Sequence, residues 1–424
     1  MTRRSRGTLA WCVLLATAVW ADARAADPET GIDSDDATEI EKADADIMEL
    51  DVASSIVDAV NIRNFATFST DVRGAYAAED TDLRNGGSER DDEFTARLRA
   101  GGAWNLLTTL RLTARAAFLC STESCDPQVA IDSDVAGNST DPGELVIDEF
   151  FLQWFQTEKF DVAAGRLQTR FVTRGGIFAK SLDRNNSHNT SVNWTDGLHA
   201  TIKPGLGRGW VAHLISEYND DEGTGSVRRA PLDFSTSNSS VSHFIAFENT
   251  QSWRYLVQRG LDVSYLPDAL LKDGEQTGRR DDYWGIVGRT AARVPLDASG
   301  RRLQLASEIG YAPKTPTNRA VGIGNPGDAD GLAWNVSASL IDFIPKHSIG
   351  ILYAQTGAGW LLSPQFASNE EQYEVRWQWR PEANIVLDAR VRQREELEQL
   401  ASSERKEKEL DYFVRLTWRY SASN

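Results

Sequence analysis

The last strand-like stretch of the chain, DYFVRLTWRY at residues 411–420, alternates between apolar and polar positions. Successive side chains of an extended chain point to opposite faces, so one face is aromatic and aliphatic while the other carries Arg415, Thr417 and Arg419. A water-soluble sandwich turns its apolar face inward, whereas a membrane barrel turns it toward lipid and its polar face toward a wet lumen. Which arrangement applies depends on whether the rest of the chain repeats the pattern at membrane-spanning length.

Segments with the same period of two recur from residue 64 onward, each about as long as a tilted membrane strand. In residues 92–104, for example, Phe94 and Leu98 alternate with Arg97 and Arg99. The predicted fold class is therefore all-β: a transmembrane antiparallel β-barrel of about sixteen strands, with fourteen or eighteen as alternatives because the eighth and ninth strands have the weakest pattern. The strands are expected near residues 64–76, 92–104, 107–119, 144–156, 158–168, 193–203, 208–219, 241–249, 256–266, 281–294, 301–311, 331–343, 347–356, 371–380, 384–395 and 410–420.

The links between these segments alternate in length. Links after even-numbered strands are short, such as residues 105–106 and 344–346, whereas links after odd-numbered strands are long and polar, such as residues 77–91 and 120–143. Outer-membrane barrels have short periplasmic turns and long external loops, and a soluble sandwich has no reason to sort its links in this way. The link lengths therefore favour the barrel independently of the strand pattern.

The first residues have the features of a secretory signal peptide. Residues 1–25 combine early arginines, an apolar run and the small-residue site Ala-Arg-Ala at 23–25. No later apolar run reaches the roughly 18 to 20 residues of a membrane helix. If the mature protein lies in a membrane, it must therefore be a barrel, predicted here to span residues 62–424.

Residues 26–61 lack the strand pattern and are strongly acidic. Apolar residues in this segment, such as Ile40, Ile47 and Leu50, have the spacing of an amphipathic helix, so the segment is expected to be periplasmic and partly helical. One interpretation is a solvated acidic leader with a short helix. The other is a helix that self-associates or partly covers the pore mouth.

The formal charge of −17 is concentrated in this leader and in the expected loops, so net charge says little about the lumen. Two cysteines, Cys120 and Cys125, remain after removal of the signal peptide. An exported location lets them pair as a small disulfide at a loop tip. A metal site is the alternative, but no histidine lies nearby.

The faces expected to line the lumen are rich in arginine. A channel selects solutes by the charge and width of a water-filled passage rather than by catalytic residues. The pattern therefore predicts a weakly anion-favouring pore, although the arginines would serve only to stiffen the wall if all of them form ladders with facing acids. The expected pore-lining residues are Arg97, Arg99, Arg111, Arg115, Arg166, Arg415 and Glu149, with Arg289, Arg293, Arg376, Arg390, Arg392, Arg419, Asp71, Asp161, Glu308, Glu374 and Asp388 also placed inward.

Other chemistry has little support in the sequence. The five histidines are scattered without metal-ligand spacing, and no GxSxG, HExxH or Walker-type motif occurs. Acids at residues 328–330 and 132–134 could hold Ca²⁺ or bridge lipopolysaccharide, but a solvated loop explains them as well. No catalytic residue, metal, cofactor or nucleic-acid partner is expected.

The block IDEFFLQWFQTEKFDVAAGRLQTRF at 147–171, followed by WTDGLHATI at 194–202, resembles Gram-negative outer-membrane porins, including alginate-export and anion-selective types. The likeness covers roughly residues 62–420. It implies a homotrimer, and a third external loop that folds into the barrel and faces arginines of the first and last strands at the narrowest point. The matching constriction loop is residues 168–192, with Arg170, Arg174, Lys180, Asp183 and Arg184.

These observations predict a bacterial outer-membrane protein, in contact with lipid and lipopolysaccharide, that passes small hydrophilic solutes by passive diffusion. The first alternative is a substrate-selective channel for an acidic solute such as a sugar acid, anionic polysaccharide or phosphate. The second is an outer-membrane phospholipase-type enzyme, which needs a Ser-His pair that the sequence does not clearly provide.

Overall fold

A computed structural model describes residues 66–122, 124–125, 128–129, 142–157, 159–169, 171–183, 195–203, 209–219, 230–275, 277–363 and 365–423. The chain divides into two units, Met1–Ser55 and Ile56–Asn424, and all described residues lie in the second. The predictions for the signal peptide at 1–25 and for the acidic segment at 26–61 fall outside the described residues, as do Arg170 and Arg184.

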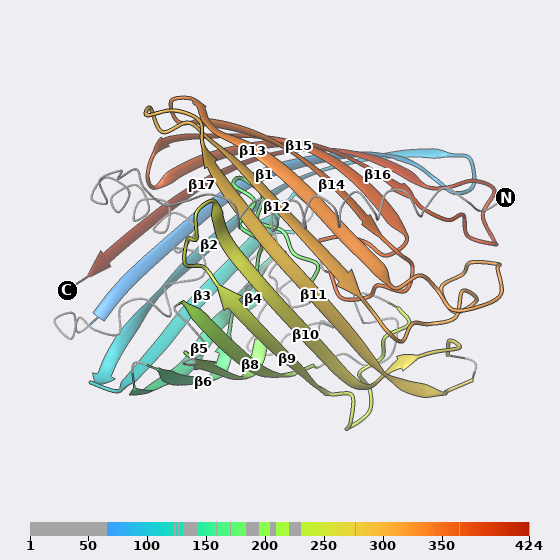
Figure 1. The fold of residues 1–424 in the computed structure, drawn as a ribbon, viewed down its shortest axis with the longest axis horizontal. Coiled ribbons are helices and arrows are strands. Elements are labelled where there is room, and N and C mark those ends of the chain that lie inside the picture. Colours follow the sequence, from blue (N-terminus) through green and yellow to red (C-terminus); the bar gives the residue numbers. More distant parts are fainter. Residues whose placement is uncertain are drawn as a thin grey trace, which may run out of the picture. The chain divides into compact units, whose positions relative to one another are not determined.

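The described chain is a closed antiparallel barrel of 16 long strands, as the alternating pattern predicts (Figure 1). Each strand pairs with its neighbours in sequence, and β1 pairs with β17 to close the ring. The short strand β4 (Gln128–Val129) adds a parallel pairing at the start of β5. The long strands are β1 (Ala66–Asp82), β2 (Ser88–Leu107), β3 (Leu110–Ser121), β5 (Glu144–Thr157), β6 (Phe160–Leu167), β7 (Thr195–Ile202), β8 (Trp210–Tyr218), β9 (Val241–Asn249), β10 (Leu256–Leu271), β11 (Arg280–Pro295), β12 (Arg302–Tyr311), β13 (Leu332–Ile344), β14 (His347–Thr356), β15 (Glu370–Glu382), β16 (Ile385–Glu396) and β17 (Lys408–Ser423).

Apolar side chains cover the outer face of the barrel. Phe68, Val72 and Tyr76 of β1 are exposed, whereas Arg73 between them is 7% exposed on the inner face. This distribution is the reverse of that in a soluble protein, where exposed large apolar patches are rare. Among the described residues, the structure has no helix long and apolar enough to cross a membrane.

The first hairpin is longer than the sequence pattern predicted. Residues 77–91 were expected to form a loop, but β1 continues to Asp82 and β2 begins at Ser88. Both faces of this extension carry charged residues, such as Glu79 and Asp80, so the apolar alternation that marks a lipid-facing strand is missing. The two strands are nevertheless paired without interruption from Ala66 to Asp82.

The connections define two ends of the barrel. Short turns join β2 to β3 and β13 to β14. The start of β1 and the end of β17 lie at the same end of the barrel as these turns, and Thr67 pairs there with Ser423. We call this the turn end and the opposite end, which carries the long connections, the loop end.

Candidate functional site: the lumen and its walls

The connection between β6 and β7, described for residues 168–169, 171–183 and 195, crosses the interior of the barrel. It leaves the ring at β6 but contacts strands on the opposite side. The Arg174 amide donates to Gln258 Oε1 of β10 at 2.6 Å, the Leu182 amide donates to Glu308 Oε2 of β12 at 2.9 Å, and Ser339 Oγ of β13 donates to the Gly175 carbonyl at 2.6 Å. We call residues 171–183 the crossing segment.

The predicted residues of the crossing segment hold it against this wall. Asp183 pairs with Arg289 of β11 at 2.6 Å, and Lys180 pairs with Glu374 of β15. All four side chains are at most 5% exposed. Lys180 and Asp183 therefore anchor the segment, and only Arg174 among its described basic residues is half-buried.

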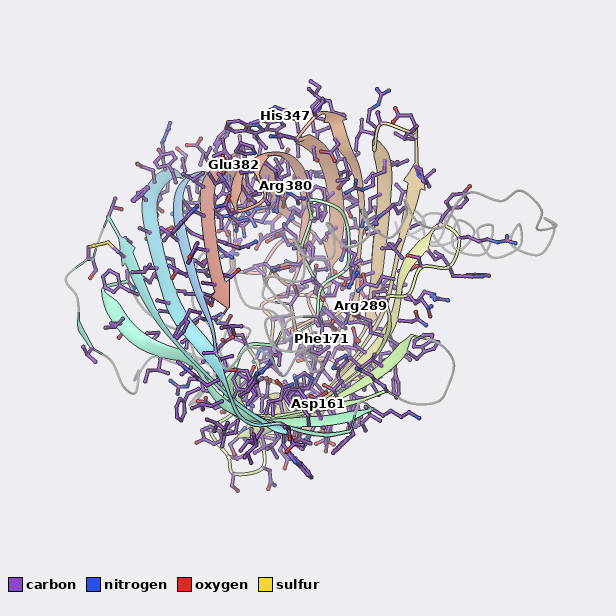
Figure 2. The ribbon with its side chains drawn as sticks, turned by 90° about the vertical axis from the view of Figure 1, so that its left-hand side faces the viewer. Asp161, Phe171, Arg289, His347, Arg380 and Glu382 are labelled. Atoms are coloured by element: carbon purple, nitrogen blue, oxygen red, sulfur yellow. A yellow bond between two sulfur atoms is a disulfide. The ribbon has the colours of Figure 1, made fainter. Side chains whose placement is uncertain are left out.

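Phe171 begins the crossing segment on an aromatic surface that the sequence did not predict. Its ring lies 4.9 Å from that of Phe244 and 5.1 Å from that of His213, and Arg289 lies over it at 6.0 Å. Figure 2 shows Phe171 and Arg289 together inside the ring of strands. The histidines are less scattered than their spacing suggested, because His199 and His213 share a hydrogen bond of 3.1 Å, but the described residues offer them no third metal ligand.

A second connection, between β14 and β15, also folds inward and supports the crossing segment. Trp360 is fully buried and packs so close to Gly310 that a Cβ there would lie 2.7 Å from its ring. Ser363 Oγ donates to the Ser181 carbonyl at 2.8 Å, and the Ser181 amide donates to Gln365 Oε1 at 2.9 Å. The strand pattern does not predict this feature, although the apolar run Trp360 to Leu362 inside a long polar link is a signal that predicts burial.

These two connections and residues 230–234 enclose an apolar core inside the barrel. The core places Ile177, Phe178 and Leu182 of the crossing segment against the inner faces of β10 to β14. Apolar burial of this kind stabilises by roughly 25 cal/mol per Å². The core thus lies against β10 to β14, and the opposite inner wall, β16 to β3, contributes no residue to it.

That opposite wall carries arginines from five adjacent strands, which we call the arginine wall. Its pairs include Arg97 with Asp71 at 2.7 Å and Arg415 with Asp388 at 2.7 Å. The arginine wall comprises Arg73, Arg97, Arg99, Arg115, Arg390, Arg392, Arg394, Arg415 and Arg419, against the acids Glu79, Asp71, Asp148, Glu149, Asp388, Glu409 and Asp411.

Not every guanidinium nitrogen of this wall is satisfied. Arg99 Nη2 and Arg415 Nη1 are buried and have no hydrogen-bond partner among the described residues. Buried donors without partners are costly, and an anion is the partner that suits an arginine best. The wall thus combines an excess of positive charge with free donors.

The predicted residues Arg111 and Glu149 also lie on the inner face. Glu149 contacts Arg115 at 3.2 Å. Arg111 lies nearer the turn end, where its Nε donates to Asn105 at 3.0 Å and its guanidinium lies over Phe155 at 5.6 Å.

Asp148 is the inner-wall residue that strict alternation missed. The pairing of β3 with β5 shifts between Arg115 and Ala116, so Asp148 is an extra residue and points inward beside Glu149. It is fully buried and pairs with both Arg99 and Arg115 at 2.9 Å.

Arg166 does not line the lumen, and that prediction was wrong. It stands opposite Phe150 on β5 and Asp196 on β7, and paired residues of an antiparallel ladder share a face. Phe150 is 55% exposed on the outer face, so Arg166 lies there too and pairs with Asp196 at 2.9 Å. The error came from placing Asp161 and Arg166 of one strand on the same face, although their odd spacing puts them on opposite faces.

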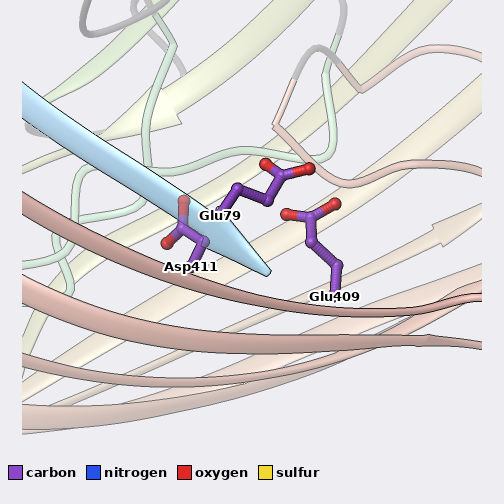
Figure 3. Close-up of side chains that lie close together, drawn as sticks. All are labelled: Glu79, Glu409 and Asp411. Atoms are coloured by element: carbon purple, nitrogen blue, oxygen red, sulfur yellow. The ribbon is translucent and has the colours of Figure 1, made fainter. Parts of the chain in front are cut away.

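Three carboxylates of the arginine wall, Glu79, Glu409 and Asp411, come close together (Figure 3). Arg394 contacts Glu79 at 3.5 Å and also pairs with Glu409, while Arg392 contacts Asp411 at 2.9 Å. These arginines pair with all three carboxylates, so the cluster belongs to the arginine wall and does not suit a cation.

Cys120 and Cys125 are joined by a disulfide at the loop end of β3, with a Cα–Cα distance of 4.6 Å. Residues 328–330, considered above for Ca²⁺, contribute Asp328 to an ion pair with Lys272 at 3.4 Å. Residues 132–134 fall outside the described residues.

Together, a closed barrel, an exposed apolar belt and an interior narrowed by an inward connection define the architecture of an outer-membrane porin. No family model and no curated protein sequence matches this chain. Among solved structures, Pseudomonas putida OprB matches at TM-score 0.55 with 10% identity, covering 84% of this chain and 94% of that one. Pseudomonas aeruginosa OccD3 (OpdP) matches at TM-score 0.51 with 9% identity, covering 88% and 96%. The chain therefore has the porin-type barrel fold that its sequence resemblance predicted.

Proposed function

We propose that this protein is an outer-membrane porin that passes small hydrophilic solutes by passive diffusion, with a weak preference for anions. The observation that carries the proposal is the position of the arginine wall, which lies on the inner face opposite the apolar core that contains the crossing segment. Solutes pass between the two, and the turn end faces the periplasm while the long connections face outward, as in other barrels of this class.

The charges of the passage explain why the preference is weak. Fixed charges between low-dielectric walls raise the local concentration of the opposite ion. Most arginines of the wall are paired, as Arg97 is with Asp71, so only part of their field reaches a passing ion. In this proposal Arg97, Arg99, Arg115 and Arg415 line the narrows, whereas Lys180 and Asp183 fix the crossing segment as the constriction.

A reversal potential in a KCl gradient across a planar bilayer tests the anion preference. We expect Cl⁻ to be favoured and the preference to fall in a double variant, Arg99→Gln with Arg415→Gln. Arg279→Gln is the matched control, because that side chain is 63% exposed in a long connection away from the arginine wall. Clear cation preference of the wild-type channel would defeat the proposal.

The excess of arginines over acids on the arginine wall favours a second candidate, a substrate-selective channel for an acidic solute. A carboxylate or phosphate that binds there should block the Cl⁻ current in a saturable manner. Purely ohmic current with every acidic solute tried would exclude this candidate and leave the general porin.

Cleavage after residue 25, a periplasmic segment at 26–61, contact with lipopolysaccharide and a homotrimer belong to the same proposal. N-terminal sequencing of the exported protein tests the cleavage. Electrophoresis of unheated samples in mild detergent tests the trimer, which should dissociate on heating.

A further inference from the structure

The charged side chains on the inner face are sorted along the barrel axis. At the loop end they are mainly acidic. Glu79 of β1 is paired in register with Asp91 of β2, and both stand on the same face as the inward pair Asp71 and Arg99. The inward acids described at this end are Glu79, Glu89, Asp91, Glu93, Glu144, Glu217, Glu370, Glu396, Glu409 and Asp411, against the inward bases Arg390, Arg392 and Arg394.

Basic side chains predominate on the inner face at the turn end. Arg302 is paired with Ile341, which is buried on the inner face of β13, and Arg380 follows the inward Gln378 on β15. Lys203 follows the inward Thr201 at the end of β7. The bases described at this end are Arg111, Arg293, Arg302, Arg380, Arg419 and Lys203, and the acids near them are Asp71, Asp161, Asp342 and Glu382. Asp161, Arg380 and Glu382 are labelled in Figure 2.

Partial pairing does not remove this polarity. At the turn end Arg302 lies 3.7 Å from Asp342, Arg419 lies 3.4 Å from Asp71, and Lys203 interacts with Asp161, but the bases there still outnumber the acids. At the loop end Arg394 forms ion pairs with Glu79, Glu409 and Glu370, so one guanidinium is shared among three carboxylates. On the described inner face, each mouth therefore keeps a net charge, negative at the loop end and positive at the turn end.

We propose that the channel rectifies, passing more current when the loop end is electrically positive than when the turn end is positive. With the loop end positive, anions enter at the basic mouth and cations enter at the acidic mouth, so each mouth concentrates the ion that enters there. With the voltage reversed, each ion must enter through the mouth that repels it, and the lumen is depleted of both. Small anions such as carboxylates and phosphates are thus admitted more readily from the turn end, which faces the periplasm under the proposed function.

Single-channel currents at equal positive and negative voltages test the inference. A biotin label at Ala298→Cys, in the exposed turn between β11 and β12, identifies the turn end of each inserted channel when streptavidin is added to one chamber. In 0.1 M KCl we expect the current with the loop end positive to be about twice the reverse current. The ratio should fall toward one in 1 M KCl, because the Debye length shrinks from about 10 Å to about 3 Å.

Charge reversals at the two ends test whether the charges of the mouths, rather than a change in folding, cause the rectification. Lys203→Glu with Arg380→Glu at the turn end, and Asp91→Lys with Glu93→Lys at the loop end, should each lower the ratio toward one in 0.1 M KCl. Arg301→Glu is the control, because it makes the same type of substitution, with half the charge change of either double variant, at the tip of a turn rather than on the inner face, and its ratio should stay near that of the wild type.

The inference depends on the proposed function, because only a conducting barrel can rectify. A wild-type ratio of one in 0.1 M KCl, or a larger current with the turn end positive, overturns the inference even if the reversal potential still shows anion preference. Cation preference with the expected ratio overturns the anion proposal but retains the rectification. A barrel that conducts no current overturns both.

Discussion

Arg289 of β11 donates a hydrogen bond of 2.6 Å to Asp183, a residue that enters the barrel from the opposite side of the ring. Both side chains are at most 1% exposed. A buried pair of this kind is expensive to break because each partner leaves an uncompensated charge behind. The contact therefore fixes where the crossing segment lies and, with it, the width of the proposed passage.

Replacement of Asp183 by asparagine should loosen the crossing segment. Arg289 keeps Asp262 as a partner, so we expect a loss of up to about 3 kcal/mol in the docking of the segment rather than collapse of the barrel. Single-channel recordings should show a larger or noisier current. Asp273→Asn, in the connection between β10 and β11, is the control, and recordings of Asp183→Asn that match it would exclude the anchoring role.

Gly310 should tolerate no side chain, because Trp360 occupies the space where its Cβ would lie. Gly310→Ala forces Trp360 to move, and overpacking of this kind costs about 1–3 kcal/mol. Since Trp360 belongs to the connection that hydrogen-bonds Ser181, we expect altered conductance together with a lower unfolding temperature.

Gly288→Ala is the control for this prediction, because an added Cβ there meets only Ile309 at 3.7 Å. Unchanged conductance in Gly310→Ala, with a lowered unfolding temperature, would show that the connection stabilises the barrel without shaping the passage.

The disulfide between Cys120 and Cys125 predicts that the exported protein has no thiol reactive to maleimide until it is reduced. A bridge that closes so short a loop contributes about 2 kcal/mol in the chain-entropy description. Cys120→Ser with Cys125→Ser should therefore lower the unfolding temperature slightly and leave conductance unchanged. Labelling of the unreduced protein would contradict the pairing.

Asp233 anchors the inward residues 230–234 through Arg280 at 2.6 Å. Burial alone would raise the pKa of Asp233, but hydrogen bonds from Ser235 and from the Arg280 guanidinium hold that pKa below its usual value. The stabilisation is therefore present above about pH 4 and is lost as the pH falls through the lowered pKa. As the pH is lowered below 4, the unfolding temperature of the wild type should fall further than that of Asp233→Asn. Parallel pH profiles of the two proteins would contradict the stabilising role of the Asp233 carboxylate.

The strands of this barrel could be predicted from the sequence because lipid and water impose opposite demands on alternate residues. The eighth and ninth predicted strands, which have the weakest pattern, form where they were expected as β9 and β10, although β10 continues to Leu271. The short turns follow for the same reason, since each marks the point where the alternation stops and restarts.

The interior could not be predicted in the same way. Alternation fails wherever one residue is inserted, and nothing in the composition of β5 shows that Asp148 is the inserted one. The inward path of residues 357–363 depends on Gly285 and Gly310 leaving space for Trp360, and these residues are distant in sequence. Such packing is a property of the closed barrel, not of any one strand.

Arg166 and Arg99 offer a direct test of which arginines act on solutes. Arg166 lies on the outer face with Asp196, whereas Arg99 belongs to the arginine wall and has a free Nη2. We expect Arg99→Gln to reduce anion preference in a KCl gradient and Arg166→Gln to leave the reversal potential unchanged. The second variant should instead lower the thermal stability, because Asp196 is left without its partner beside apolar Phe150 and Leu198. The contradicting outcome is a shift in reversal potential for Arg166→Gln that is as large as the shift for Arg99→Gln. It would mean that charge on the outer face of β6 also acts on the passage, and the assignment of solute contact to the arginine wall would fail.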